Sequence, residues 1–293
     1  MNALIRALVD ALYLGSLYAL YALGVAMIFG IMRLINFAHA SLIAAGAYAP
    51  AVTTGQPLAL RIVFAVAVCV GLALLLELVA FRSLRGADPA TLPVTSFAVY
   101  VTLTAVFEAV FGSLPTASPM NDWFQLSWVA GSLYLPTING LTLVVVGVLL
   151  IGLSLFLAKT RWGLQMRAAA EDFSTARLLG VRANRVIMLA FAISGMLAAA
   201  AAILLVGKVG TVTPTFGIIP VLFGLIAAVV GGLSSLRGAV LGGFVIGITS
   251  QLLQYFLPED LRPFRDAFLF ATVFLIPVFR PQGLISPKQG VRV

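Results

Sequence analysis

Residues 58–81 read LALRIVFAVAVCVGLALLLELVAF, and Arg82 follows directly. An α-helix needs about 20 mainly apolar residues to cross the hydrocarbon core of a bilayer, and this run is long enough. Its two charged residues, Arg61 and Glu77, lie near its two ends. The stretch therefore predicts a transmembrane helix that ends at a basic residue.

The whole chain has the composition of a membrane protein. Of its 293 residues, 61% are hydrophobic and 10% are charged, whereas charged residues make up about 25% of a soluble domain. These proportions exclude a water-soluble enzyme and a disordered chain. A disulfide framework is excluded as well, because Cys69 is the only cysteine. The net charge of +8 comes from basic residues at the ends of apolar runs, which indicates membrane topology rather than nucleic-acid binding.

Further apolar runs predict an all-α, polytopic fold in a single domain, residues 1–293, with eight or nine transmembrane or re-entrant helices. The number depends on the short run 37–52 and the glycine-rich run 216–236. The segments 37–52 and 227–236 either span the bilayer or re-enter it. The other predicted spans are 9–31, 58–81, 93–112, 138–158, 186–206, 239–257 and 264–279.

The distribution of basic residues predicts the orientation of the chain. With the N-terminus outside, most of the 18 Lys and Arg residues fall in loops on the inner side, as the positive-inside rule requires. The C-terminus is then cytoplasmic.

The inner loop 159–185 is longer than a connection between two helices needs. It reads KTRWGLQMRAAAEDFSTARLLGVRANR, and it is rich in helix formers. The pattern predicts one or two short amphipathic helices that lie across the membrane surface. The residues expected on the apolar face are Ala169, Phe173, Ala176 and Leu179. Such a loop suits either of two roles: contact with anionic lipid, or docking of a cytoplasmic partner.

The sequence lacks the residues for catalysis or metal binding. His39 is the only histidine and Cys69 the only cysteine, so a metal cluster and a catalytic triad are both incomplete. A P-loop requires glycine before Lys-Thr, and here Ala158 precedes Lys159 and Thr160. We therefore expect no metal and no cofactor in this chain and no enzymatic activity of its own. Any ATP that drives transport would be bound by other subunits.

Three polar residues lie at the start of the short run 37–52. Asn36, His39 and Ser41 are candidates for lining a translocation path, because irregular backbone at membrane depth must line a cavity or pack within protein. A lone histidine is, however, more often a hydrogen-bonded part of the structure.

Two carboxylates lie inside predicted spans, where ionisable groups are costly and indicate function. Glu108 is deep in its span and is expected to face the protein interior or a water-filled path. Glu77 lies near the inner end of its span and is expected to snorkel or to pair with Arg82. These residues keep an alternative open, namely an ion-coupled secondary transporter that uses Glu108 or Glu77 as its proton site.

Residues 227–247 read AAVVGGLSSLRGAVLGGFVIG. Small residues let helices approach closely in lipid. The glycines expected to serve helix packing are Gly231, Gly232, Gly238, Gly242 and Gly243. Two short helices joined near Arg237 would resemble the pair joined at 33–36, which suggests a duplicated two-element unit of the kind found in transporters.

Four stretches together resemble the permease subunits of branched-chain amino acid ABC importers, of the LivH type. They occur in order and cover nearly the whole chain. The stretches are GVAMIFGIMRLINFAHASLIAAGAY (24–48), RAAAEDFSTARLLGVRANRVIMLAFAISGMLA (167–198), AAVVGGLSSLRGAVLGG (227–243) and FRDAFLFATVFLIPVFRPQGLI (264–285).

The resemblance implies a permease in the bacterial inner membrane that forms half of a translocation pathway. Its implied partners are a homologous second permease subunit, two cytoplasmic ATPase subunits, a periplasmic substrate-binding protein and membrane lipid. The loop is similar to a coupling helix that seats in an ATPase groove. Its implied contact residues are Glu171, Asp172, Arg177 and Gly180.

The sequence departs from the family pattern at a few positions. Ala40 and Ser41 stand where the family commonly has Gly-Glu, and Arg237 replaces a usual proline. Ala199 and Ala202 stand where glycine is frequent. The missing carboxylate leaves the cargo open among a branched-chain amino acid, urea, an amide or another small acid.

Overall fold

The structure is a computed structural model, and it describes residues 2–84, 88, 91–120, 124, 126–130, 133–233, 235–280 and 283–285. The helices and strands follow one another in this order: α1 (Asn2–Met32), α2 (His39–Val52), α3 (Leu58–Leu76), η1 (Glu77–Phe81), α4 (Thr91–Phe111), β1 (Thr116–Ala117), β2 (Ser127–Ala130), β3 (Leu133–Pro136), α6 (Thr137–Lys159), α7 (Arg161–Glu171), α8 (Phe173–Leu178), α9 (Ala183–Val209), β4 (Thr211–Val212), α10 (Ile218–Gly231), α11 (Leu236–Phe256), η2 (Glu259–Phe264) and α12 (Arg265–Phe279).

Six helical stretches of the described chain are long and apolar enough to cross a membrane, and they correspond to six of the predicted spans. The prediction of a helical, multi-pass membrane fold is therefore confirmed. The remaining apolar runs form α2, α10 and α12, which have 14, 14 and 15 residues. At 1.5 Å per residue, 14 residues extend about 21 Å, which is shorter than the roughly 30 Å hydrocarbon core.

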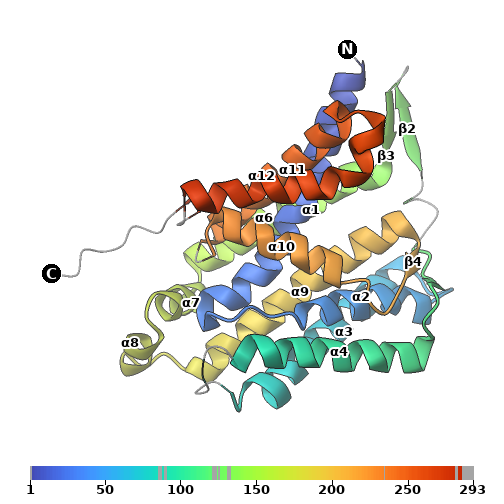
Figure 1. The fold of residues 1–293 in the computed structure, drawn as a ribbon. Helices are drawn as coiled ribbons and strands as arrows, with labels where there is room; N and C mark the ends of the chain where they lie inside the picture. Colours follow the sequence, from blue (N-terminus) through green and yellow to red (C-terminus); the bar gives the residue numbers. More distant parts are fainter. Residues whose placement is uncertain are drawn as a thin grey trace.

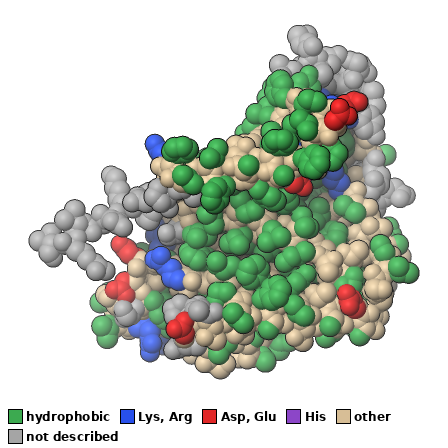
Figure 2. Space-filling view, viewed as in Figure 1, with side chains coloured by type: hydrophobic (Ala, Val, Ile, Leu, Met, Phe, Trp, Pro, Cys, Tyr) green, Lys and Arg blue, Asp and Glu red, His purple; other side chains and the backbone are tan. Residues whose placement is uncertain are grey.

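The helices differ in how much of their surface lies inside the chain. In the apolar stretch of α1, 83% of the residues are buried, and in that of α9 72% are buried. In the corresponding stretch of α4 only 11% of the residues are buried. Exposed Leu, Val and Phe side chains cover α3, α4, α6 and α12. Figure 2 shows this apolar surface across the middle of one face, with charged side chains gathered toward its margins. A surface of this kind is stable in lipid and not in water.

Glycines allow α10 and α11 to cross at close range. A Cβ atom on Gly231 would overlap the backbone of Gly238, and one on Gly238 would overlap the backbone of Gly231. One turn further along α11, Gly242 lies against the carbonyl of Ala227. Gly232 has a different part, because its φ of +106° ends α10 in a conformation that side chains disfavour.

The other glycine face of α11 packs against α1. Gly243 lies against the backbone of Ala19, and Gly247 lies against Gly15. Small residues on both helices bring the two backbones together, and close packing of this kind stabilises helix pairs in lipid. As a result α1 is enclosed by α9, α10 and α11, which together form the centre of the bundle.

The bundle has two chemically different ends. At the loop end, where α7 and α8 lie, α7 packs against α1, α6 and α9. At the strand end, β1 pairs antiparallel with β4 (Thr116 opposite Val212), and β2 pairs with β3 (Ser127 opposite Pro136). Figure 1 shows α7 and α8 toward the left, and β2, β3 and β4 toward the right.

A buried arginine holds the strand end together. The guanidinium of Arg61 on α3 donates to the carbonyl of Pro50 on α2, at 3.0 Å, and to the carbonyls of Pro119 and Met120. Next to it, the hydroxyl of Ser118 donates to the carbonyl of Ala47 at 2.8 Å. The segment after β1 is thereby fixed across the last turn of α2, where helix carbonyls otherwise lack partners.

Candidate functional site

The chain is unwound between α1 and α2, at the loop end of the bundle. Arg33 follows α1 with a φ of +55°, a left-handed conformation that is unusual for a residue with a side chain. The side chain of Asn36 accepts a hydrogen bond from the amide of Ala38 at 3.1 Å. The hydroxyl of Ser96 on α4 accepts from the amide of Phe37 at 3.1 Å. The unwound backbone is therefore packed within the protein, as the membrane environment requires.

His39 begins α2 and is buried, with 1% of its surface exposed. The Ser194 hydroxyl on α9 donates to the carbonyl of Gly24 on α1 at 3.0 Å, and it also lies 3.1 Å from His39 Nδ1. A hydroxyl has a single proton, so this geometry makes Ser194 the acceptor of the Nδ1–H bond. Gly24 leaves the space that the imidazole ring occupies, because a Cβ atom there would lie 2.8 Å from His39 Cε1.

The other two predicted path residues, Asn36 and Ser41, are near neighbours of His39 in the sequence. Asn36 and Ser41 are buried, at 2% and 1% exposure. Among the described residues, Asn36 Nδ2 and Ser41 Oγ have no hydrogen-bond partner. Buried polar atoms without partners are costly, so the start of α2 and the segment before it have unused capacity to bind water, solute or a polar group of another subunit.

The two candidate carboxylates lie apart from this group. Glu108 is exposed on α4, within the last turns of that helix. Glu77 is completely buried at the start of the π-helical segment η1. The expectation that Glu77 snorkels is therefore wrong, whereas its pairing with Arg82 stays a prediction. The segment η1 places both Glu77 and Phe81 inside, where Phe81 packs against Phe191 with ring centroids 5.6 Å apart.

The loop 159–185 forms the two short helices α7 and α8. Thr160 caps α7 by accepting from the amide of Gly163 at 2.9 Å. Asp172 interrupts the predicted helix and caps α8, because its carboxylate accepts from the amide of Thr175 at 3.1 Å and from its hydroxyl at 2.6 Å. Gly180 ends α8 with a φ of +86°. Both residues thus define the shape of the loop.

The exposed surface of α7 and α8 combines charge with apolar side chains. Glu171 and Arg177 are exposed. Leu178 and Leu179 are 87% and 80% exposed. Leu179 had been expected on the inner face with Ala176, but α8 ends at Leu178, so the next residue turns outward with the chain. Two adjacent exposed leucines between basic residues are typical of a surface that a partner covers.

One hydrogen bond connects this loop with the unwound segment. The guanidinium of Arg33 donates to the carbonyl of Ala170 at 3.3 Å. Ala170 lies in the last turn of α7, where carbonyls have no partner within the helix and a cation is favourable. A displacement of α7 would therefore act directly on the segment that precedes α2.

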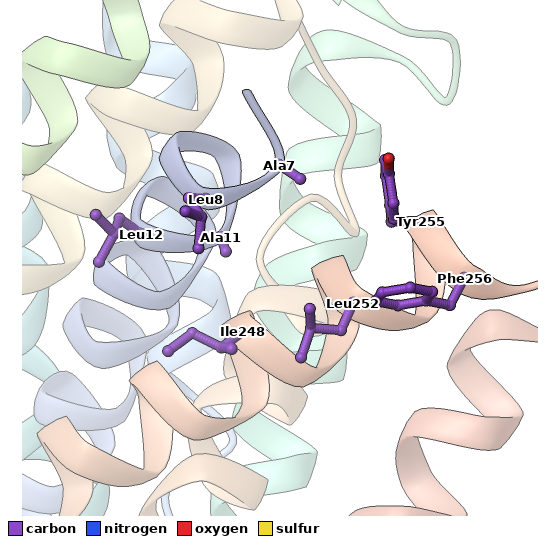
Figure 3. Close-up of a pocket in the computed structure, with 8 residues that line it drawn as sticks. All are labelled: Ala7, Leu8, Ala11, Leu12, Ile248, Leu252, Tyr255 and Phe256. Carbon is purple, nitrogen blue, oxygen red and sulfur yellow. The ribbon is translucent and has the colours of Figure 1, made fainter. Parts of the chain in front are cut away.

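An apolar groove at the strand end has a different character. Figure 3 shows it between α1 and α11, lined by Ala7, Leu8, Ala11, Leu12, Ile248, Leu252, Tyr255 and Phe256. The hydroxyl of Tyr255 points away from the groove. The described residues direct no polar group into the groove, and lipid chains can fill it.

Comparison with known proteins gives a consistent result. A family model described as branched-chain amino acid transport system, permease component, matches residues 7–277. The high-affinity branched-chain amino acid transport system permease protein BraD of Pseudomonas aeruginosa is 32% identical, over 99% of this chain and 98% of the relative. LivH of Escherichia coli is 30% identical, over 96% and 94%. The fructose import permease protein FrcC of Rhizobium meliloti is 34% identical over only 38% of this chain and 33% of its own length. No solved structure gives a significant match.

Proposed function

Because this chain belongs to the branched-chain amino acid transport permease family, we propose that it forms half of the translocation pathway of an ABC importer. The proposed cargo is a branched-chain amino acid or a related small polar solute. One observation carries the proposal: the amino acid permeases BraD and LivH align with nearly the whole chain, whereas the sugar permease FrcC aligns with 38% of it.

The proposed topology puts the loop end in the cytoplasm of a bacterium and the strand end in the periplasm, with the C-terminus inside. The concentration of Lys and Arg at the loop end supports this orientation. The six long helices would cross the inner membrane. The short helices α2 and α10 would each form one arm of a broken pair, with α1 and α11 as their longer partners.

The energy for transport would come from two cytoplasmic ATPase subunits, since the sequence has no P-loop. We assign their docking surface to α7 and α8. Leu178 and Leu179 would insert into the partner, Glu171 and Arg177 would make polar contacts at the rim, and Asp172 and Gly180 would fix the shape of the loop. Apolar anchors surrounded by polar contacts are the usual arrangement of binding energy at such interfaces.

Movement of the ATPases would reach the path through α7. The buried face of α7 includes Met166 and Ala169, which tie the helix to the bundle. Through the bond between Arg33 and the Ala170 carbonyl, α7 would pull on the segment before α2. That segment carries Asn36, and the first turns of α2 carry His39 and Ser41, so the same displacement would rearrange all three proposed path residues.

A homologous second permease would complete the pathway, and a periplasmic binding protein would deliver the solute at the strand end. Glu108 supports the position of the second permease, because a carboxylate that faces lipid is costly and this residue is exposed on α4. We therefore place the face of α4 that carries Glu108 toward the second subunit and the path between them.

The test is ATP-driven uptake by the reconstituted complex. Proteoliposomes would contain the chain, its homologous permease and the ATPases, with the binding protein outside and ATP inside. We expect uptake of radiolabelled leucine that requires ATP and continues when an uncoupler removes the proton gradient. An ATPase with its P-loop lysine replaced is the control, and it should abolish uptake. Uptake that does not depend on ATP and stops when the proton gradient is removed would overturn the proposal. A parallel assay with urea and a short amide defines the cargo.

A further inference from the structure

Four polar residues meet at the strand end, where α1, α6 and α9 converge. The carboxylate of Asp10 on α1 accepts a hydrogen bond from the side-chain amide of Asn139 on α6 at 3.0 Å. The ammonium group of Lys208, in the last turn of α9, lies 4.1 Å from the ring centroid of Tyr13 on α1.

The two charged residues of this cluster are near each other but are not joined. Lys208 lies over the ring of Tyr13, which is one turn along α1 from Asp10. Among the described residues, however, Lys208 makes no ion pair within 4.0 Å, and the nearest cation to Asp10 is Arg6, at a loose 3.9 Å in an exposed position. Two opposite charges on one surface that do not pair with each other can bind a ligand that carries both a positive and a negative charge.

The two charged residues of the cluster are accessible, whereas its other two residues are buried. The side chain of Asp10 is 29% exposed, and Lys208 is exposed. Beneath them, Asn139 and Tyr13 are each 3% exposed. Asn139 Oδ1 is buried and has no hydrogen-bond partner among the described residues. An amide oxygen accepts hydrogen bonds, so Asn139 Oδ1 can accept one from a donor such as an ammonium group.

We propose that Asp10, Asn139, Tyr13 and Lys208 form a binding site for the zwitterionic end of a free α-amino acid. The α-ammonium group would contact the Asp10 carboxylate and Asn139 Oδ1, with the ring of Tyr13 beside it. The α-carboxylate would pair with Lys208. Lys208 would then move off the ring of Tyr13, and the α-ammonium group would take its place there. This site deepens the proposed function, on which it rests, because it gives the strand end a recognition element for the class of solute delivered there.

The side chain of the amino acid takes no part in this recognition. The four residues address only the two main-chain charges, and the apolar groove lined by Leu8 and Leu252 lies on another face of α1. The site would therefore accept amino acids as a class and reject molecules that carry only one of the two charges. Selection for branched side chains would be left to the delivering protein.

The experiment measures ligand binding to the permease–ATPase complex in nanodiscs, without the binding protein, by isothermal titration calorimetry. The probes are leucine, leucinamide, which lacks the carboxylate, and 4-methylpentanoate, which lacks the ammonium group. We expect the wild-type complex to prefer leucine over each of the other two by about tenfold, the effect of one charged hydrogen bond. Equal binding of all three probes would refute the site.

Two substitutions separate recognition from a structural role. Lys208→Gln should remove the preference over leucinamide alone, and Asp10→Asn should remove the preference over 4-methylpentanoate alone. Lys208→Arg, which keeps the charge, should retain both preferences. Arg262→Gln is the matched control, because Arg262 is another cation at the strand end, in an exposed pair with Glu259 at 3.5 Å. Loss of binding for all probes together, or unchanged preferences in Lys208→Gln and Asp10→Asn, would overturn the assignment.

The fate of the proposed function is read separately, from ATP-driven leucine uptake by the wild-type complex. If uptake occurs but the probe preferences do not depend on Asp10 and Lys208, the site is wrong and the transport proposal stands. If the wild-type complex takes up no amino acid, the transport proposal fails whatever the binding data show.

Discussion

The hydroxyl of Ser194 lies 3.1 Å from Nδ1 of His39, and it joins the first turn of α2 to the middle of α9. The same hydroxyl donates to the carbonyl of Gly24, so that one side chain connects α2, α9 and α1. The short helix α2 is thereby held at its broken end by the two most buried long helices of the bundle.

Replacing Ser194 by alanine should lower the free energy of unfolding by about 1–3 kcal/mol, because His39 Nδ1 would remain buried without a partner. Thermal unfolding of the purified chain in detergent measures the effect. Ser154→Ala is the control, since Ser154 is exposed on α6 and its replacement should change little. In a double mutant, His39→Ala and Ser194→Ala should be clearly non-additive, and strict additivity would contradict the proposed bond.

Adding a methyl group at the crossing of α10 and α11 should destabilise the bundle. Gly238→Ala places a Cβ atom against the backbone of Gly231, and overpacking of this kind costs about 1–3 kcal/mol. Gly152→Ala on α6 is the matched control, because nothing lies within 4 Å of the added atom. That variant should be neutral or up to about 1 kcal/mol more stable, from helix propensity. Equal melting temperatures for the two variants would argue against close packing at Gly238.

A charge at the tip of the loop should weaken ATPase binding without unfolding the spans. Leu178→Asp removes an anchor that is 87% exposed, and loss of such an anchor costs about 2–4 kcal/mol of binding free energy. Co-purification of the ATPases with the tagged permease measures it. Leu114→Asp serves as the control, because Leu114 is 78% exposed at the opposite end. Normal recovery of the ATPases with Leu178→Asp would place the docking surface elsewhere.

Neutralising Glu108 should leave ATP-driven uptake largely intact. Glu108→Gln keeps the size and polarity of the side chain but cannot release a proton, and an ATP-driven mechanism does not require one. Uptake by proteoliposomes with and without an uncoupler is the measurement. If the variant assembles normally with its partners and yet transports nothing, Glu108 is essential in the path and the ion-coupled alternative regains support.

The sequence predicted the elements whose signal is local. The runs around 58–81 and 186–206 are mainly apolar over the length of a membrane span, and both are long helices in the structure. Gly180 was expected to end a helix, and it does so in the left-handed conformation. Such elements can be predicted because a membrane helix makes all its backbone hydrogen bonds within its own segment, so its existence does not depend on neighbouring segments.

Features that depend on distant residues were not predicted, or were predicted wrongly. His39 was recognised as unusual, but its partner Ser194 lies 155 positions away along the chain. Glu77 was expected either to snorkel or to pair with Arg82, and its complete burial in the π-helical turn contradicts the snorkelling. The cluster of Asp10, Asn139 and Lys208 comes from three helices that are far apart in sequence, and no spacing in the chain indicates it.

The sequence by itself determined that this protein is a helical membrane protein, and where its long helices run. These properties follow from hydropathy and helix length, both of which are local. Only the tertiary structure decided which polar side chains meet, which carboxylate is buried, and which leucines face outward. The physical reason is that an apolar helix can present any of its faces to lipid, so its rotation is set by close packing against neighbours such as Gly238 and Gly243.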